Sequence, residues 1–140
     1  MIRPMLAATC VDVETLSFPL LASPKYDGIR ALVYNMQVYS RTGKLIRSQV
    51  VQEKFGREEL NGTDGELIYG DPWAKDCFRL TTSACMSETF PSHLAKNKLK
   101  FFAFDCFTNQ YQSYNERIDK ISYAWNKFCI PVCQKPVTNL

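Results

Sequence analysis

Apolar and polar positions along this chain alternate in short runs, a pattern typical of strands with one buried face. Asn35 and Met36 separate two of these runs and predict a tight hairpin. Asn61 and Gly62 form a second turn signal ahead of another run. The predicted strands cover residues 20–22, 29–34, 37–40, 66–69 and 99–107.

Helical spacing is weaker and falls between the strands. Residues 49–60 are polar with scattered apolar positions and predict a helix. Residues 81–90 predict another, which Pro91 is expected to stop. Strands and helices in this order predict an α+β fold built on an antiparallel sheet.

A third helix is predicted near the C-terminus. Ser113 and Glu116 have the spacing of a capping box, which marks the start of a helix. Pro131 is expected to end it, and residues 132–140 have only a β-like beginning. Four apolar side chains fall on one face of this predicted helix: Ile118, Ile121, Trp125 and Phe128.

Size and charge leave the choice of partner open. The chain has 140 residues, the length of one domain, and 46% hydrophobic residues, which excludes a disordered chain. No apolar run approaches the length that crosses a bilayer, so we expect no membrane partner. The net charge of +3 permits a polyanionic partner without requiring one, because a surplus of this size also serves solubility.

The six cysteines do not have the spacing of a metal site. Cys129 and Cys133 lie four residues apart, and the single histidine, His93, is distant from both in sequence. Zinc ligands usually come in closer pairs. We expect reduced thiols, several of them buried.

Residues 25–30, KYDGIR, carry the most informative chemistry. A lysine amine can attack phosphorus, and Arg30 can hold charge on a phosphate. We expect the strand at residues 20–22 to deliver Lys25, and Asp27 to orient a metal-bound water or a phosphate-side group. The alternative is an exposed lysine in an ordinary turn, because Asp-Gly is a favoured turn pair.

Two polar signals follow at intervals along the chain. Ser40 and Arg41 offer a hydroxyl and a planar fork of donors to a phosphate, or they are simply a hairpin exit. Glu66 follows Asp64-Gly65 at the start of an apolar strand. It can accept from a ribose hydroxyl or hold a metal ion, and its alternative is an acidic turn residue before a strand.

An aromatic run at residues 101–107 is the fourth signal. Strand alternation predicts Phe102 and Phe104 on one face, with Phe101 and Asp105 on the other. An aromatic ring at the edge of a pocket can stack on adenine. The alternative is that these rings are all core.

These four signals, in this order, resemble the motifs of ATP-dependent DNA ligases. K-x-D-G-x-R is the nucleophile motif of the covalent nucleotidyltransferases, which include DNA ligases, RNA ligases and mRNA capping enzymes. The resemblance runs from Lys25 to about Asp105 and is closest to the compact ligases of tailed bacteriophages. The opening residues 3–7, RPMLA, are also similar to a stretch that lies near the nucleotide in those enzymes.

The resemblance implies a fold and a reaction. Residues 1–140 would form part of an antiparallel-sheet nucleotidyltransferase domain, of the ATP-grasp-like DNA ligase adenylation type, incomplete at the C-terminus and without an OB-fold domain. ATP would adenylate Lys25 with help from Mg²⁺, and the AMP would serve to seal nicked duplex DNA in replication, repair and recombination. The implied location is cytoplasmic, or the host cytoplasm for a viral protein.

The same resemblance implies roles for individual residues. Lys25 would be the catalytic residue, and Glu66 would bind a metal ion as well as the nucleotide. The implied nucleotide contacts are Pro24, Lys25, Arg30, Arg41, Glu66 and Phe104. The implied DNA contacts are Asp27, Ser40 and Arg41.

The chain departs from the family in two places. Ser23 stands where relatives often have an acid that accepts from the adenine amino group. The later acid-Gly and Lys-x-Lys motifs are not found after Phe107. We therefore expect a subunit of a split ligase, whose partner supplies those motifs, or a truncated gene product, with little adenylation by this chain alone. An inactive relative, an RNA ligase or capping-type enzyme, and a non-catalytic nucleotide- or DNA-binding protein remain alternatives.

Overall fold

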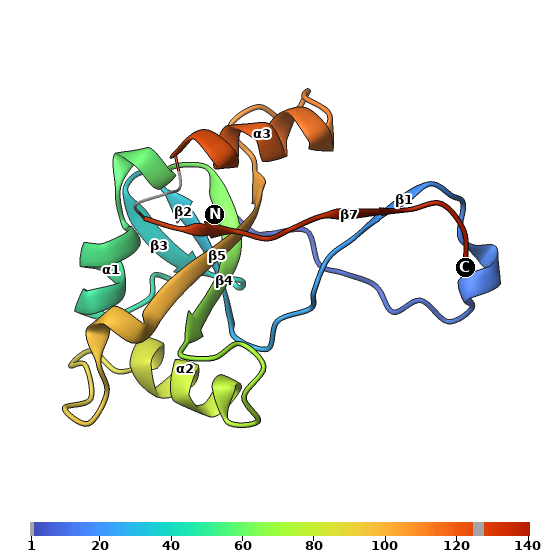
Figure 1. The fold of residues 1–140 in the computed structure, drawn as a ribbon. Coiled ribbons are helices and arrows are strands. Elements are labelled where there is room, and N and C mark those ends of the chain that lie inside the picture. Colours follow the sequence, from blue (N-terminus) through green and yellow to red (C-terminus); the bar gives the residue numbers. More distant parts are fainter. Residues whose placement is uncertain (1, 125–127) are drawn as a thin grey trace.

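A five-stranded sheet forms the body of the protein, in a computed structural model that describes residues 2–124 and 128–140 (Figure 1). The strand order is β3-β2-β4-β5-β6, and only the β5–β6 pair is parallel. The predicted α+β fold on a mainly antiparallel sheet is therefore confirmed. The strands are β2 (Ile29–Tyr34), β3 (Gln37–Ser40), β4 (Thr63–Tyr69), β5 (Leu99–Cys106) and β6 (Ile130–Pro131).

The predicted hairpin between β2 and β3 is confirmed by its backbone. Asn35 and Met36 have φ values of 49° and 57°, the left-handed conformation that a type I′ hairpin turn requires at both central positions. The strand predicted at residues 66–69 begins earlier, at Thr63. It is longer because Gly62, with φ of 82°, turns the chain and donates its N–H to the Val33 carbonyl, which starts the ladder.

Helix α1 (Gln49–Phe55) is shorter than the predicted helix over residues 49–60. Gly56 ends it, and a 3₁₀ turn at Glu58–Leu60 follows. Ser48 caps its start by accepting from Val51 N.

Helix α2 (Cys77–Met86) corrects the prediction of a helix over residues 81–90 with Pro91 as its stop. Its buried side chains are Cys77, Thr81, Ala84 and Cys85, at helical spacing. Thr81 lies inside the helix because its hydroxyl donates to the Cys77 carbonyl and accepts from Tyr69 N. Ser87 is already extended, so the helix ends well before Pro91.

Helix α3 (Tyr114–Ala124) begins at the predicted capping box. Glu116 accepts from both the backbone N and the hydroxyl of Ser113. Ile121 is buried as predicted, while Trp125 lies outside the described residues. Pro131 does not terminate this helix; it lies in β6, paired with Ala103 of β5. Within the part of the chain that is described, no helix is long and apolar enough to span a bilayer.

One continuous core lies on one face of the sheet and is sealed by side chains of all three helices. Its largest fully buried members include Phe101, Leu60 and Leu67. Val51 and Phe55 of α1 pack there with Cys85 of α2. Burial of this apolar surface stabilises the body, at about 25 cal/mol per Å².

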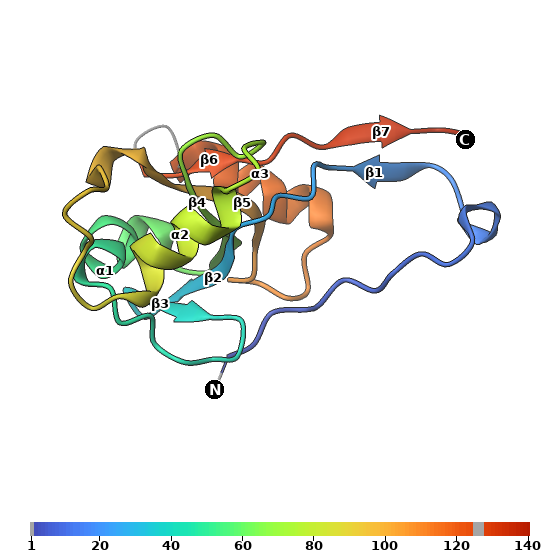
Figure 2. The ribbon, with the colours of Figure 1, turned by 90° about the horizontal axis from the view of Figure 1, so that it is seen from below.

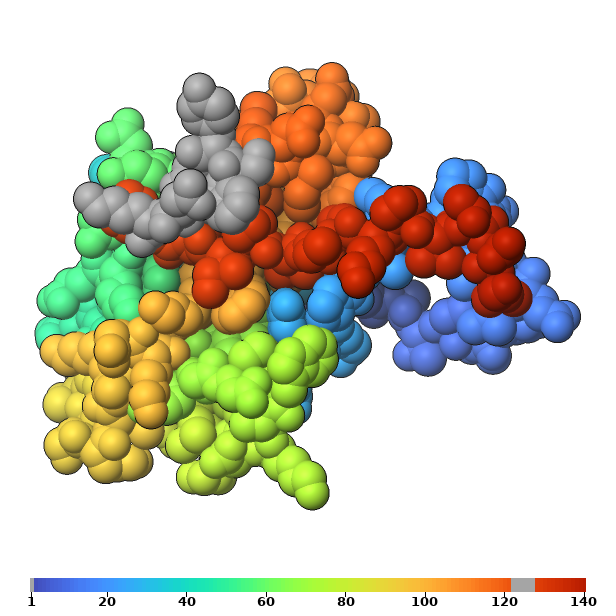
Figure 3. All heavy atoms as spheres, in the orientation of Figure 1, coloured from blue at the N-terminus to red at the C-terminus, as the bar shows by residue number. Residues whose placement is uncertain are grey.

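A two-stranded arm extends away from the body (Figures 1 and 2). It consists of β1 (Leu20–Ala22) and β7 (Lys135–Val137), which pair antiparallel. The strand predicted at residues 20–22 is confirmed, although it joins this arm and not the main sheet. In the space-filling view the arm, with a 3₁₀ turn at Val13–Thr15, projects beyond the body (Figure 3).

All six cysteines are free thiols, and four of them are buried, as predicted. Burial raises the pKa of Cys85 and of Cys129 to about 12, so both stay protonated at neutral pH. Cys10 and Cys133 are exposed.

Candidate active site

Lys25 lies in the loop of residues 23–28 that links the arm to β2, and not at a strand end as predicted. Its side chain is exposed, yet it lines two adjoining cavities of about 700 and 730 Å³. The first, which we call the nucleotide-sized cavity, brings together side chains from all four sequence signals. Its lining includes Pro24, Lys25, Arg30, Arg41, Glu66 and Phe104, together with Met5, Leu6 and Ala7 of the N-terminal segment.

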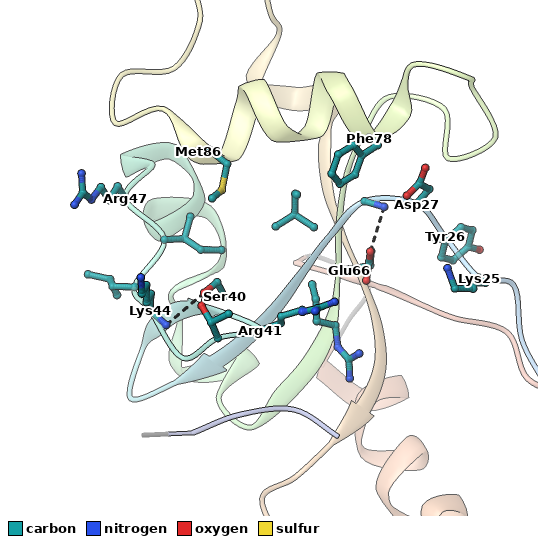
Figure 4. Close-up of a pocket in the computed structure, with 16 residues that line it drawn as sticks. Lys25, Tyr26, Asp27, Ser40, Arg41, Lys44, Arg47, Glu66, Phe78 and Met86 are labelled. Atoms are coloured by element: carbon teal, nitrogen blue, oxygen red, sulfur yellow. Dashed lines mark hydrogen bonds between the residues drawn. The ribbon is translucent and has the colours of Figure 1, made fainter. Parts of the chain in front are cut away.

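The second cavity, which we call the basic cavity, continues from Lys25 to the end of β3 and the loop that follows it (Figure 4). Asp27 and Ser40 line this cavity, so the predicted DNA contacts are distributed along it. Its wall also holds three basic side chains, Arg41, Lys44 and Arg47, and two apolar side chains of α2, Phe78 and Met86.

Strand register places three of the motifs in a single row. Arg30 of β2 lies opposite Glu66 of β4, which in turn lies opposite Phe102 of β5. Because alternate residues share a face, Asp64 and Phe104 belong to the same face of the sheet. We call this the site face, and the opposite surface the core face.

Two glycines are needed for this close assembly. A side chain at Gly28 would place its Cβ 2.1 Å from the Leu67 carbonyl oxygen. A side chain at Gly65 would place its Cβ 2.3 Å from the Phe102 carbonyl oxygen. The glycines of the two D-G motifs are therefore required by backbone packing, in addition to any role in chemistry.

Arg30 is held by a bidentate ion pair with Asp64. Its Nε and Nη2 donate to the two Asp64 carboxylate oxygens, each at 2.7 Å. Nη2 also donates to the Met5 carbonyl, and the guanidinium carbon lies 4.7 Å from the centroid of the Phe104 ring. Burial disfavours the Arg30 charge, but the hydrogen bonds that Arg30 donates to Asp64 and the negative charges around it together outweigh this effect and raise the Arg30 pKa.

Glu66 connects the sheet to the lysine loop. Its Oε1 accepts from the backbone N of Gly28 at 3.1 Å (Figure 4). Burial raises the pKa of Glu66, while the Gly28 N–H, Arg30 and Lys25 act in the opposite direction. This carboxylate therefore remains close enough to Lys25 to feel its charge, at the boundary of both cavities.

The prediction that Phe104 and Asp105 lie on opposite faces of β5 is wrong. The β4–β5 register shifts between Asp64 and Gly65, so that Asp105 pairs with Asp64 and Ala103 with Gly65. A bulge of this kind breaks strict alternation. Phe104 and Asp105 consequently line one further cavity of about 420 Å³, where Asp105 pairs with Arg117 of α3.

The site fits a metal ion only in part. In the part of the chain that is described, no three His, Cys, Asp or Glu side chains gather in a metal-binding cluster. Glu66 and Asp27 are the carboxylates of the basic cavity. Mg²⁺ is commonly bound by one or two carboxylates and completed by substrate phosphates, so this set is compatible with it.

Sequence reasoning missed two side chains that build the site, Asp64 and Tyr26. Asp64 was a candidate only as part of its turn, yet it is buried and orients Arg30. Tyr26 lines both cavities, and its ring packs against Trp73. The D-G repeat at residues 64–65 was the one sequence signal that could have found Asp64.

The fold is that of a DNA ligase adenylation domain. Residues 4–124 match the family model described as "ATP dependent DNA ligase domain". The chain belongs to the ATP-dependent DNA ligase family. No curated protein sequence matches it.

Solved structures agree with this family. Two structures of the Chlorella virus DNA ligase-adenylate superpose with TM-scores of 0.79 and 0.77, at 29% and 32% identity. The matched regions include 99% and 98% of this chain, but only 52% and 51% of the viral chains. A structure from a study of Lig E DNA ligases, described as binding DNA with a minimal scaffold, matches at 25% identity with a TM-score of 0.62. This match covers 85% of this chain and 45% of the Lig E chain. The chain thus spans about half the length of these ligases.

Proposed function

We propose that this chain carries the nucleotide-accepting lysine of an ATP-dependent DNA ligase. The observation that supports it is the lining of one cavity, where Lys25 meets Arg41, Glu66 and Phe104. These residues come from four separate sequence motifs and line the same cavity. A related viral ligase is described as a ligase-adenylate, which is the product expected of such a lysine.

The reaction begins with attack of the neutral Lys25 amine on the α-phosphorus of ATP. A nitrogen–phosphorus bond forms, the bond to the β-phosphate oxygen breaks, pyrophosphate leaves and the amine loses a proton. Arg41 offers its guanidinium to phosphate oxygens from the shared wall of both cavities. Glu66 accepts from a ribose hydroxyl through its carboxylate, and Phe104 supplies a ring for adenine.

Transfer to DNA uses the second cavity. The AMP passes from Lys25 to the 5′-phosphate of a nick, and the 3′-hydroxyl then displaces AMP to seal the strand. The basic side chains that line the cavity suit a sugar-phosphate backbone, with Asp27 next to Lys25 and with Ser40 and Arg41 also in its wall (Figure 4). Mg²⁺ would be held by Glu66 or Asp27 with the phosphates, and it supplies charge neutralisation.

Pyrophosphate departure builds up negative charge that cations must stabilise, yet the attacking Lys25 amine is neutral and Arg30 is already paired with Asp64. We propose that a further polypeptide segment supplies more positive charge, in a second subunit or a longer chain. The chain alone should form little lysyl-AMP, and the completed ligase should form it readily.

Nick sealing tests the proposal. The chain is combined with candidate completing polypeptides, ATP and Mg²⁺, and is offered nicked duplex DNA or nicked RNA. We expect sealing of nicked DNA that is abolished by Lys25→Ala. Sealing that survives this substitution would contradict the assignment, and sealing of RNA alone would favour an RNA ligase. ATP binding without any covalent adduct would favour a non-catalytic binding protein.

A further inference from the structure

Three aromatic rings pack in series beside Lys25, and we call them the aromatic ladder: Phe102, Tyr26 and Trp73. The Tyr26 ring is the middle member, with its centroid 4.9 Å from that of Phe102 and 5.5 Å from that of Trp73. Both pairs are tilted by 55°, within the range of attractive aromatic contacts. Tyr26 directly follows Lys25, so the ring contacts of the ladder restrain the residue next to the one that carries the amine.

The turn after β4 is organised so that it presents Trp73. Gly70 has φ of 75°, a conformation that favours glycine, and its N–H donates to the Lys98 carbonyl. The backbone N of Trp73 donates to Asp71 Oδ1 at 2.9 Å. Although Trp73 is 68% exposed, its backbone is therefore fixed while its ring reaches Tyr26.

The loop that carries Lys25 is held at two points. At its end, Gly28 N donates to Glu66. In its middle, Tyr26 is half-buried between the exposed residues Lys25 and Asp27. The ladder supplies this second point, from the site face of β5 on one side and from the turn after β4 on the other.

We propose that Trp73 is a positioning residue for Lys25. By holding Tyr26 against Phe102, it fixes the backbone of residues 24–28 so that the Lys25 amine faces the nucleotide-sized cavity. This inference rests on the proposed function of Lys25. A role for Trp73 as a stacking platform for a base is less favoured, because its ring is already engaged with Tyr26.

Hydrogen exchange tests the hold on the loop without ATP or DNA. Trp73→Ala should raise amide exchange of residues 25–28 about tenfold, the equivalent of one aromatic contact, and leave β4 and β5 at wild-type rates. Trp73→Phe, which keeps a ring, should restore protection to within about threefold. Tyr111→Ala is the matched control, because Tyr111 is 91% exposed and lies in the loop before α3.

Adenylation kinetics test the consequence for Lys25. In the mixture that supports AMP transfer to wild-type protein, Trp73→Ala should lower the maximal rate of adduct formation about tenfold, with little change in the ATP concentration at half-maximal rate. Trp73→Phe should recover most of the rate, and Tyr111→Ala should match wild type. A general loss of stability would instead raise exchange throughout β4 and β5.

The outcomes separate this inference from the proposed function. Wild-type exchange at residues 25–28 in Trp73→Ala would overturn the positioning role, even if Lys25 is adenylated normally. Weaker binding of nicked duplex DNA with unchanged exchange and adduct rate would also overturn it, and would make Trp73 a DNA contact. If the wild type never gains AMP, even with the completing polypeptide, while Trp73→Ala still speeds exchange of the loop, the function proposed for Lys25 is contradicted and the hold of the ladder on the loop stands.

Discussion

The two faces of the β4–β5 pair differ in what surrounds their side chains. On the core face, Phe101 and Leu67 are almost fully buried among apolar side chains. On the site face of the same strands, Glu66 and Phe104 are only half-buried and line a cavity. Phe101 and Leu67 therefore contribute mainly to stability, while Glu66 and Phe104 are available for chemistry, which makes the contributions of these residues separable by mutation.

The difference arises from what each face buries. Apolar side chains gain free energy when they leave water, at about 25 cal/mol per Å². Carboxylates lose it unless they are paired, and burial raises the pKa of both Asp64 and Glu66. The site face keeps these charges beside Arg30 and the Gly28 N–H, where part of that cost is offset.

The largest expected effect is on the core face. Phe101→Ala should lower the free energy of unfolding by about 3–5 kcal/mol, because it leaves a cavity next to Phe55. Phe104→Ala should cost about 1 kcal/mol, mainly through its contact with Arg30, yet weaken ATP binding more than any core change that leaves the fold intact. Urea unfolding and equilibrium ATP binding measure the two effects. Equal losses of stability would remove the distinction between the faces.

The contribution of each ion pair to the free energy of unfolding should increase with the burial of its side chains. The side chains of Arg30 and Asp64 are 20% and 10% exposed, those of Arg117 and Asp105 are 21% and 23% exposed, and those of Arg79 and Asp76 are 70% and 49% exposed. Three matched substitutions sample this series: Asp64→Ala, Asp105→Ala and Asp76→Ala.

The expected losses of unfolding free energy are about 3 kcal/mol at position 64, about 1–2 kcal/mol at position 105 and under about 1 kcal/mol at position 76. Removing Asp64 costs most because it leaves Arg30 charged and without its carboxylate partner. Chemical denaturation measures the series. An inverted order would show that burial does not control these pairs.

The smallest effect should be a gain in stability. Glu66→Gln keeps an acceptor for Gly28 N but removes a carboxylate whose pKa burial has raised. The folded wild type binds this proton more readily than the unfolded chain does, so it loses stability as pH rises through the raised pKa. The Gln variant should therefore have a slightly higher melting temperature than the wild type at pH 7–8. Below the ordinary carboxyl pKa the two melting temperatures should not differ in this way. The variant should also lose adenylation. A lower melting temperature at pH 8 would contradict this interpretation.

Local patterns predicted most of the sheet. The hairpin at Asn35-Met36, the buried strand β5 and the capping box at Ser113 depend on neighbours in sequence, and the structure confirms them. Helix α2 was misplaced because a long-range bond from Tyr69 N to Thr81 fixes its register, and such a bond leaves no local signal.

The site was predictable as a set of motifs and not as a geometry. Lys25, Arg41, Glu66 and Phe104 do line one cavity, as their order along the chain suggested. The loop position of Lys25 follows from β1 pairing with β7, more than a hundred residues away in sequence, so a local pattern could not predict it. The bulge that turns Asp105 to the site face, and the ring contact of Trp73, are likewise tertiary features.

Peptide-level mass spectrometry after reaction with ATP and Mg²⁺ tests the central claim most directly. The protein is incubated with and without the completing polypeptide, digested, and searched for AMP attached to a side chain. We expect one AMP, on Lys25, that increases when the completing polypeptide is present and is lost in Lys25→Ala. AMP on another residue, or its complete absence from a mixture that seals nicked DNA, would contradict the account.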